Sequence, residues 1–392
     1  MTYSFDEMPD RKYEHARKWD LGLIRQDYQV PEDFIPMWIA DMDFNIAPEI
    51  ALDLEELIHK GALGYIYTYQ DFYDAVIQWH HKRRGVELKQ EWISLTYGTV
   101  STLHNVVQCF CEPGDKVMMH APIYEPFLSS AKKQGVESIV LALKVENQKY
   151  TIDFNEMALK MALEKPKIYF LCSPHNPSGK IWSKTEIDKI LAICQKYQVL
   201  LVVDEVHSEM IIQGKFHSIG EWLDESKDVI WLTSPNKAFN LGGLKTSYSI
   251  IANPQRRKCF LEQLGKNSIT SPNPFGIKAL ISAYNKGEAW LEEATQYIRE
   301  NYKVLKENFK GSPLRWMPME ASYLLWVNIE SLGEDTDEFV KTLAQDYGLI
   351  VESGNHFVAK GEGWIRMNLG MPRPYIEEAC KRILEKISEK EV

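Results

Sequence analysis

The 392-residue sequence has few cysteines, and none has the spacing that metal sites and redox motifs use. Its six cysteines are scattered, and Cys109 and Cys111 are separated by one residue, so no Cys-x-x-Cys pair occurs. We therefore predict reduced thiols in a cytosolic protein rather than a disulfide framework. Glu205 and His207 lie close together but lack the spacing of a zinc motif, so no metal is expected.

Long hydrophobic runs and an excess of basic charge are also missing. No apolar stretch approaches the roughly 18 residues that a membrane-spanning helix needs, and the first twenty residues are too charged for a signal peptide. The net charge is −10, which argues against a nucleic-acid partner because phosphate binding needs clustered basic side chains. We expect a soluble, cytoplasmic protein with neither a membrane nor a nucleic acid as partner.

The sequence does contain short β-branched runs that alternate with helical patterns of 10–15 residues, from about residue 92 to 251. This alternation predicts an α/β fold with a doubly wound, mainly parallel sheet of seven strands. After about Asn285 the pattern becomes mostly helical with two more strands, which predicts a smaller α+β domain.

These patterns predict three parts of the chain. Residues 1–50 form an N-terminal arm and part of the small domain, residues 51–285 form the large domain, and residues 286–392 form the small C-terminal domain. The apolar and acidic stretch IPMWIADMDF, residues 35–44, has neither a strand nor a helix period and is expected to cross a surface as an arm.

The residues that could carry chemistry fall at the carboxyl ends of the predicted strands, where open parallel sheets bind ligands. A lysine in the turn SPNKAFNLGGLK, residues 234–245, can be desolvated and so kept partly uncharged, as attack on a carbonyl requires. Neither a Walker loop nor GxGxxG occurs, but TYGTVST, residues 96–102, places small residues where a helix N-terminus could bind phosphate. The strand-end residues are Gly98, Tyr124, Asn176, Asp204 and Ser234.

Each of these residues also has an ordinary structural interpretation. Asp204 could cap a helix or balance a buried cation, Asn176 is typical of a turn, and Tyr124 is typical of a core aromatic residue. Ser234 and Lys237 have the Ser-x-x-Lys spacing of serine acyl-transfer enzymes. That interpretation fails because the SDN motif is absent and the KTG-like sequence follows Lys237 too closely for the intervening elements.

Taken together, the motifs resemble those of the fold-type I pyridoxal 5′-phosphate (PLP) enzymes, the aspartate aminotransferase superfamily. Within it, the chain looks most like the cystathionine β-lyase branch of MalY/PatB type, the Cβ–S lyases. The resemblance runs nearly from end to end. Its motifs, in order, are PMWIADMDF, LGY, APIYEPF, LCSPHNPSGKIW, VVDEVH, SPNKAFNLGGLK, GEAWL and GEGWIRMNL.

The resemblance implies roles for five residues around the cofactor ring. Lys237 would hold PLP as a Schiff base and move the proton from the substrate Cα. Asp204 would pair with the protonated pyridine nitrogen, which keeps the ring an electron sink. Asn176 and His207 would hydrogen-bond the phenolic oxygen of the ring. Tyr124 would stack on its face and belong to the catalytic set.

The resemblance also implies a phosphate site and a dimer. Backbone N–H groups of Thr99 and Val100, together with Ser234 and Asn236, would bind the phosphate. Tyr65 would reach the phosphate from the other subunit, so the active unit would be a homodimer.

The chain departs from the usual family pattern at four places. Asparagine is usual at Ser173, and serine or threonine is usual at Asn236. The loop often reads GVV where this chain has residues 98–100, GTV. Glu125 stands where an apolar or aromatic residue often follows the stacking tyrosine. The first three departures are expected to alter hydrogen bonds without removing the cofactor, and Glu125 and the loop are expected to affect substrate preference.

The implied reaction is α,β-elimination of L-cystathionine or another cysteine S-conjugate to pyruvate, ammonia and a thiol. Arg366 and Asn176 would bind the α-carboxylate of this small-molecule amino acid. Two alternatives stay open from the residues alone. One is a class I/II aminotransferase, which shares the early steps, and the other is a module that binds the cofactor without turnover.

Overall fold

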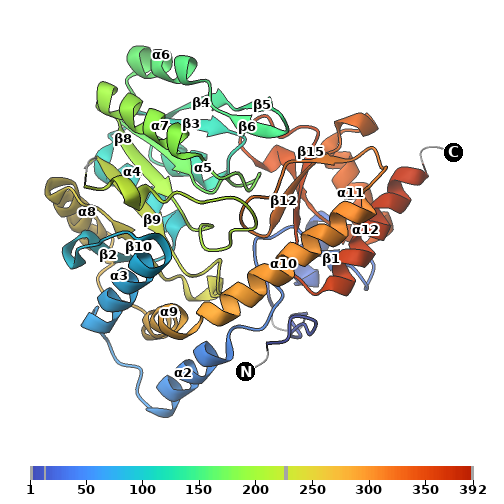
Figure 1. The fold of residues 1–392 in the computed structure, drawn as a ribbon, viewed down its shortest axis with the longest axis horizontal. Helices are drawn as coiled ribbons and strands as arrows, with labels where there is room; N and C mark the ends of the chain where they lie inside the picture. Colours follow the sequence, from blue (N-terminus) through green and yellow to red (C-terminus); the bar gives the residue numbers. More distant parts are fainter. Residues whose placement is uncertain (1–2, 13–14, 225–227, 390–392) are drawn as a thin grey trace.

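The computed structural model describes residues 3–12, 15–224 and 228–389, and its centre is a seven-stranded sheet (Figure 1). Strand β10 runs antiparallel to both of its neighbours, β2 and β9, and the pairings from β9 to β4 are all parallel. This confirms the predicted mainly parallel α/β sheet. The strands in spatial order are β2 (Ile93–Thr96), β10 (Ser247–Ile250), β9 (Val229–Thr233), β8 (Leu200–Asp204), β7 (Ile168–Cys172), β3 (Lys116–Ala121) and β4 (Glu137–Ala142).

Helices cover both faces of this sheet because its central strands are apolar on both sides. In β8, Leu200 and Val202 pack in one buried cluster, with side chains of α4 (Thr99–Phe110), α5 (Pro126–Lys132) and α8 (Pro254–Lys266). Leu201 and Val203 pack in the other, with α3 (Gln70–Arg84), α7 (Lys184–Tyr197) and α9 (Pro274–Lys286). Such continuous apolar runs are typical of parallel strands buried on both faces. Helices α2 (Pro48–His59) and α6 (Phe154–Glu164) also belong to this part.

A smaller antiparallel sheet lies in the C-terminal part of the chain. The long helix α10 (Glu288–Asn308) contacts α9 of the large part and α12 of the small part, and Figure 1 shows it extending along both. The predicted two strands and flanking helices are present, and two short strands complete the sheet. Its elements are β11 (Arg315–Trp316), β12 (Leu324–Asn328), β14 (Glu352–Ser353), β15 (Trp364–Asn368), α11 (Thr336–Tyr347) and α12 (Arg373–Ser388).

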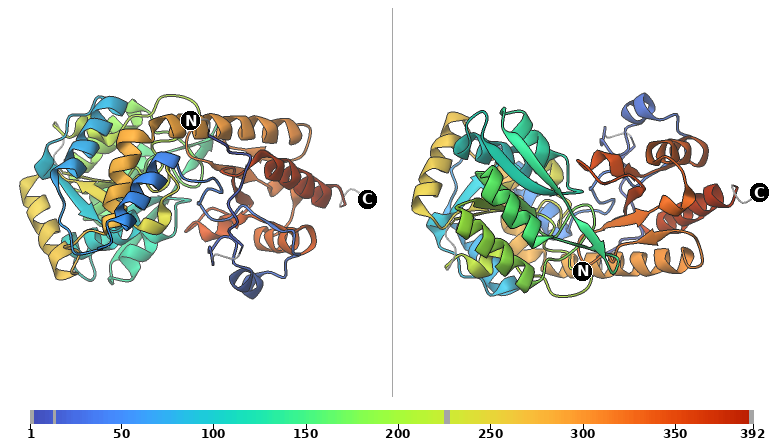
Figure 2. Two further views of the ribbon diagram at one scale, coloured as in Figure 1. Left: turned by 90° about the horizontal axis from the view of Figure 1, so that it is seen from below. Right: turned by 90° about the horizontal axis from the view of Figure 1, so that it is seen from above.

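The N-terminal segment packs with the C-terminal part (Figure 2). It contains α1 (Leu21–Asp27) and β1 (Ile35–Pro36), and β1 pairs in parallel with β13 (Leu349–Ile350). The stretch 35–44 does not cross a surface: Met37, Met42 and Phe44 are buried. The surface prediction was wrong because the stretch packs inside the molecule. The Met37 N–H donates to the Ile350 oxygen at 2.7 Å, and the side chains of Asn368 and Asn240 bond backbone oxygens farther along the stretch.

Local sequence signals predicted the first and last residues of several elements correctly. The apolar runs of residues 93–96, 168–172 and 364–368 each predict a strand, and β2, β7 and β15 have these bounds. The capping box of Ser183 and Glu186 is present at the start of α7, where each side chain bonds the backbone N–H of the other residue. The apolar run of residues 137–145 predicts one strand, but the structure divides it at Leu143, and a hairpin of β5 (Lys144–Glu146) and β6 (Lys149–Thr151) follows.

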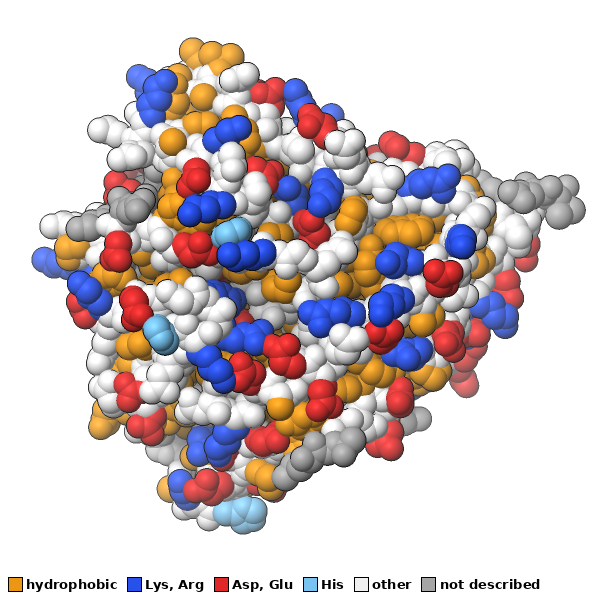
Figure 3. Space-filling view, in the orientation of Figure 1, with side chains coloured by type: hydrophobic (Ala, Val, Ile, Leu, Met, Phe, Trp, Pro, Cys, Tyr) orange, Lys and Arg blue, Asp and Glu red, His pale blue; other side chains and the backbone are white. Residues whose placement is uncertain are grey.

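Acidic and basic side chains are interspersed over the face drawn in Figure 3. Among the described residues, no helix is both long and apolar enough to cross a membrane.

Candidate active site

A cavity of about 890 Å³ lies where the carboxyl ends of the parallel strands face the small sheet. Its walls come from both parts of the chain, since Lys237 follows β9 and Arg366 lies on β15. The strand-end residues meet here because parallel strands end at the same edge of a sheet. The predicted site residues that line it are Thr99, Val100, Tyr124, Asn176, Asp204, His207, Lys237 and Arg366.

The amine of Lys237 donates a hydrogen bond to the backbone oxygen of Ala40, at 2.6 Å. Burial lowers the pKa of Lys237 from 10.5 to about 8, although Asp41 and Asp204 oppose the shift and Arg366 adds to it. About a tenth of this amine is therefore uncharged at pH 7, far more than for an ordinary lysine, and a nucleophile or proton acceptor must be uncharged.

We expect Lys237 of the cofactor-free protein to react with an acylating reagent at a rate that rises through pH 8 and then levels off. Only the unprotonated amine reacts, so the midpoint of the rate follows the lowered pKa. Peptide mass spectrometry measures the modification at Lys237 across pH. A midpoint near 10.4, that of an ordinary lysine, would contradict the lowered pKa.

Asp204 ends β8 on the face covered by α4. Burial raises its pKa to about 6; hydrogen bonds from the Val206 N–H (3.0 Å) and the Thr99 side chain, and the nearby Lys237, act in the opposite direction. The carboxylate is therefore mostly ionised above pH 6 in a desolvated place. A buried carboxylate of this kind favours a cationic ligand.

Arg366 points into the cavity from the small sheet. One of its terminal nitrogens donates to Asn176 Oδ1 at 3.1 Å, and the other donates to the Trp38 backbone oxygen at 2.7 Å. Glu352 lies opposite on β14, with 3.8 Å between its Oε2 and the guanidinium. Arg366 Nε is buried and has no hydrogen-bond partner among the described residues. Arg366 lines the cavity, and an arginine in such a position is suited to bind a carboxylate.

The other cavity residues offer neutral hydrogen-bonding groups and an aromatic face. Burial lowers the pKa of His207 to about 3, so its ring is neutral, and its Nδ1 lies 3.3 Å from Ser322 Oγ. Tyr124 is 40% exposed and borders the cavity with its ring. At the start of α4, Gly98 is the N-cap with φ 87° and no side chain caps the helix, so the first N–H groups, including Thr99 and Val100, are available to an anion.

Three predicted residues do not line this cavity. The Ser234 hydroxyl donates to the Thr246 backbone oxygen at 2.6 Å and accepts from the Asn236 N–H at 3.1 Å. Asn236 Oδ1 is buried without a partner among the described residues. Tyr65 is fully exposed and borders a separate cavity of about 830 Å³ that includes Lys245.

Two of the departures from the family pattern lie in different environments. Ser173 is buried beside the strand end, and its Oγ has no partner among the described residues. Glu125 is exposed at the start of α5 and does not line the cavity.

Several groups at the site were not predicted from the sequence. The backbone oxygens of Trp38 and Ala40 hold Arg366 and Lys237, and Tyr323 also donates to the Ala40 oxygen, at 3.2 Å. The position of Glu352 opposite Arg366 follows from the pairing register of β14 and β15. The apolar-acidic stretch 35–44 was the only sequence signal for these contacts, because backbone acceptors leave no mark on residue type.

Comparisons with known proteins identify the family of the chain. A family model described as aminotransferase class I and II matches residues 33–383. Cystathionine β-lyase PatB of Bacillus subtilis is 32% identical over 390 residues, which cover 98% of this chain and 100% of PatB. Cystalysin from Treponema denticola, solved with a PLP cofactor, has a TM-score of 0.94, 30% identity and full coverage of both chains. A PLP-bound putative aminotransferase from Clostridium difficile has a TM-score of 0.94 and 30% identity, with 98% of this chain and 100% of that chain covered. The chain therefore belongs to the aminotransferase class I and II family of PLP-dependent enzymes, in the branch that includes PatB.

Proposed function

We propose that the protein is a carbon–sulfur lyase that cleaves L-cystathionine or a related cysteine S-conjugate by α,β-elimination. The products are pyruvate, ammonia and a thiol. The observation that carries this proposal is the end-to-end similarity to a cystathionine β-lyase, combined with a lowered-pKa lysine and a carboxylate-binding arginine in one cavity. An aminotransferase would use the same residues, so the comparison with PatB favours the lyase.

The residues present fit PLP in their chemistry. The Lys237 amine suits an aldehyde, and the buried Asp204 carboxylate suits a protonated pyridine nitrogen. The uncapped start of α4, whose residues Thr99 and Val100 line the cavity, suits a phosphate.

We assign the cofactor-binding residues as follows. Lys237 holds the aldehyde carbon, Asp204 pairs with the ring nitrogen, Asn176 and His207 hydrogen-bond the phenolic oxygen, and Tyr124 stacks on the ring. The N–H groups of Thr99 and Val100 bind the phosphate, with Ser234 and Asn236 beside them. Ser234 needs its hydroxyl to rotate away from Thr246 before it donates to a phosphate.

The substrate is held and deprotonated by two side chains. Arg366 binds the α-carboxylate, which replaces the weak 3.8 Å contact with Glu352 by a direct charge-assisted hydrogen bond. The Lys237 amine accepts the Cα proton, and the negative charge left on Cα would be stabilised by PLP when it is bound there. The electron pair then forms a second bond between Cα and Cβ as the Cβ–S bond breaks, and the sulfur leaves as a thiolate. Water hydrolyses the resulting enamine to pyruvate and ammonia.

Transamination is the second candidate, and the similarity to the putative aminotransferase from Clostridium difficile favours it. In that reaction Lys237 would deliver the proton taken from Cα to a carbon of the cofactor instead. The amino group would then pass to a 2-oxo acid. The same base and the same arginine serve both reactions, so only the products distinguish them.

A substrate panel tests the proposal. The holoenzyme is incubated separately with L-cystathionine, S-methyl-L-cysteine and L-alanine, each with and without 2-oxoglutarate, and thiol and glutamate are measured. We expect thiol from the two sulfur compounds whether or not 2-oxoglutarate is present. Glutamate formation from all three without any thiol would replace the lyase by the aminotransferase.

We also propose that the protein is a homodimer in which Tyr65 of the partner subunit reaches the phosphate. The exposed Leu63 and Tyr67 flank Tyr65 and offer apolar surface for such an interface. Light scattering is expected to give twice the chain mass of 45.4 kDa. Tyr65→Phe is expected to weaken PLP retention on dialysis about tenfold, the effect of one hydrogen bond to a charged group, whereas Tyr67→Phe leaves it unchanged. A fully active monomer would contradict this assignment.

A further inference from the structure

The irregular segment 38–43 touches both reactive side chains of the cavity through its backbone. The Trp38 oxygen accepts from Arg366 at 2.7 Å, and the Ala40 oxygen accepts from Lys237 at 2.6 Å. These oxygens are two residues apart in one chain. The conformation of this segment therefore sets where the amine lies relative to the guanidinium.

Side chains from several elements fix this segment. Asn368 of β15 donates to the Ile39 and Asp41 oxygens at 2.6 and 2.8 Å. Asn240 donates to the Met42 oxygen at 3.0 Å and accepts from the Met42 N–H at 3.2 Å. The segment thus replaces the missing strand or helix ladder with side-chain hydrogen bonds.

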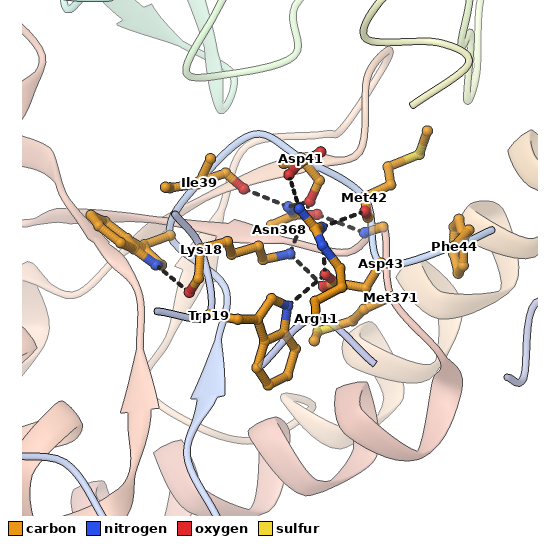
Figure 4. A network of polar contacts seen from close by, with 12 residues as sticks. Arg11, Lys18, Trp19, Ile39, Asp41, Met42, Asp43, Phe44, Asn368 and Met371 are labelled. Carbon is orange, nitrogen blue, oxygen red and sulfur yellow. Dashed lines mark hydrogen bonds and ion pairs between the residues drawn. The ribbon is translucent and has the colours of Figure 1, made fainter. Parts of the chain in front are cut away.

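At the far end of the segment lies a fully buried ion pair between Lys18 and Asp43 (Figure 4). Lys18 Nζ lies 2.5 Å from Asp43 Oδ2 and also donates to the Asp41 backbone oxygen at 2.9 Å. Trp19 Nε1 and an Arg11 nitrogen donate to Asp43 Oδ1, at 2.8 and 3.1 Å. Both carboxylate oxygens are therefore satisfied.

A buried ion pair usually adds little to the stability of a fold, since replacing it by apolar residues is often neutral or stabilising. What the pair provides is a defined position for the segment. We propose that Lys18 and Asp43 are positioning residues, whose ion pair fixes residues 38–43 and thereby places the Lys237 amine relative to the Arg366 guanidinium. The proposal rests on the roles of Lys237 and Arg366 given above.

The test compares Lys18→Met with a matched control. In Lys18→Met, Asp43 keeps its bonds to Trp19 and Arg11. Lys386→Met is the control because Lys386 is also a buried lysine paired with a carboxylate, Glu334, at 2.9 Å, but lies on α12 away from the cavity. Both holoenzymes are measured for kcat, KM, Tm and the pH at which the visible band of bound PLP changes.

We expect Lys18→Met to lower kcat/KM about 100-fold, as a misplacement near 1 Å does. Its kcat falls because the base moves, its KM rises because the arginine moves, and the pH midpoint of the visible band shifts. Lys386→Met should keep kcat and KM within about twofold of the wild type and leave the pH midpoint unchanged, because effects of distant sites are independent. This holds even if its Tm falls as much as that of Lys18→Met. Wild-type kinetics and midpoint in folded Lys18→Met would overturn the proposal.

If Lys18→Met does not fold, a milder variant tests the same proposal. Trp19→Phe removes one hydrogen bond to Asp43 and leaves the ion pair. It is expected to lower kcat/KM about threefold to tenfold, in line with one hydrogen bond to a charged group, and unchanged values would overturn the proposal. All variants are assayed with the reaction that the wild type is found to catalyse. An error in the proposed reaction therefore shows in the wild-type products, whereas an error in the positioning proposal shows only in the comparison of variants with the wild type.

Discussion

Replacing Lys237 by alanine is expected to lower turnover of sulfur amino acids at least about 10⁴-fold, because the chain loses its proton acceptor and its covalent attachment point together. No other amine lines the reactive end of the cavity near Asp204; among the described lining residues the only other lysine is Lys341, on α11. Steady-state thiol release measures the loss. Borohydride reduction followed by peptide mass spectrometry should show the PLP adduct on Lys237 of the wild type and none in the variant.

Lys386→Met is the matched control for this variant, since it also removes a buried lysine but not one that lines the cavity. It should retain the adduct and the activity. An adduct of unchanged yield in Lys237→Ala would assign the covalent attachment to another lysine.

Asp204→Asn is expected to lower turnover about 10³-fold, the upper range for removing one preorganised electrostatic group. The substitution keeps size and an oxygen for the Val206 N–H, but a neutral amide does not stabilise a protonated ring nitrogen. PLP should still bind, because Lys237 and the start of α4 are unchanged. Turnover per bound PLP measures the effect.

Glu205→Gln is the matched control for Asp204→Asn. Glu205 is the next residue and is equally buried, but its carboxyl accepts from Ser218 and Ile219 and does not line the cavity. It should lower turnover far less than Asp204→Asn. Equal losses in the two variants would mean that Asp204 acts only through the packing of the strand end.

The sequence predicted the large sheet well because two independent signals agreed. Apolar runs such as that of β8 gave the buried strands, and turn residues gave their ends. Since parallel strands end at one edge, the cluster of Asp204, Asn176 and Lys237 followed from topology alone. Their chemical roles and the domain boundaries at residues 50 and 285 stay predictions.

What the sequence did not provide was the set of contacts that depends on backbone shape. The segment 35–44 has no period, so its burial and its carbonyl contacts with Lys237 and Arg366 were not predictable from pattern. The engagement of Ser234 with Thr246 and the pairing of Glu352 with Arg366 depend on strand register, which a single sequence does not fix.

The most direct test of the lyase assignment is product stoichiometry from L-cystathionine with no 2-oxo acid present. The holoenzyme should release pyruvate, ammonia and thiol in equal amounts over many turnovers, and Lys237→Ala should release none. If the wild type forms neither pyruvate nor thiol, yet passes amino groups to added 2-oxoglutarate, the protein is an aminotransferase and the elimination account is wrong.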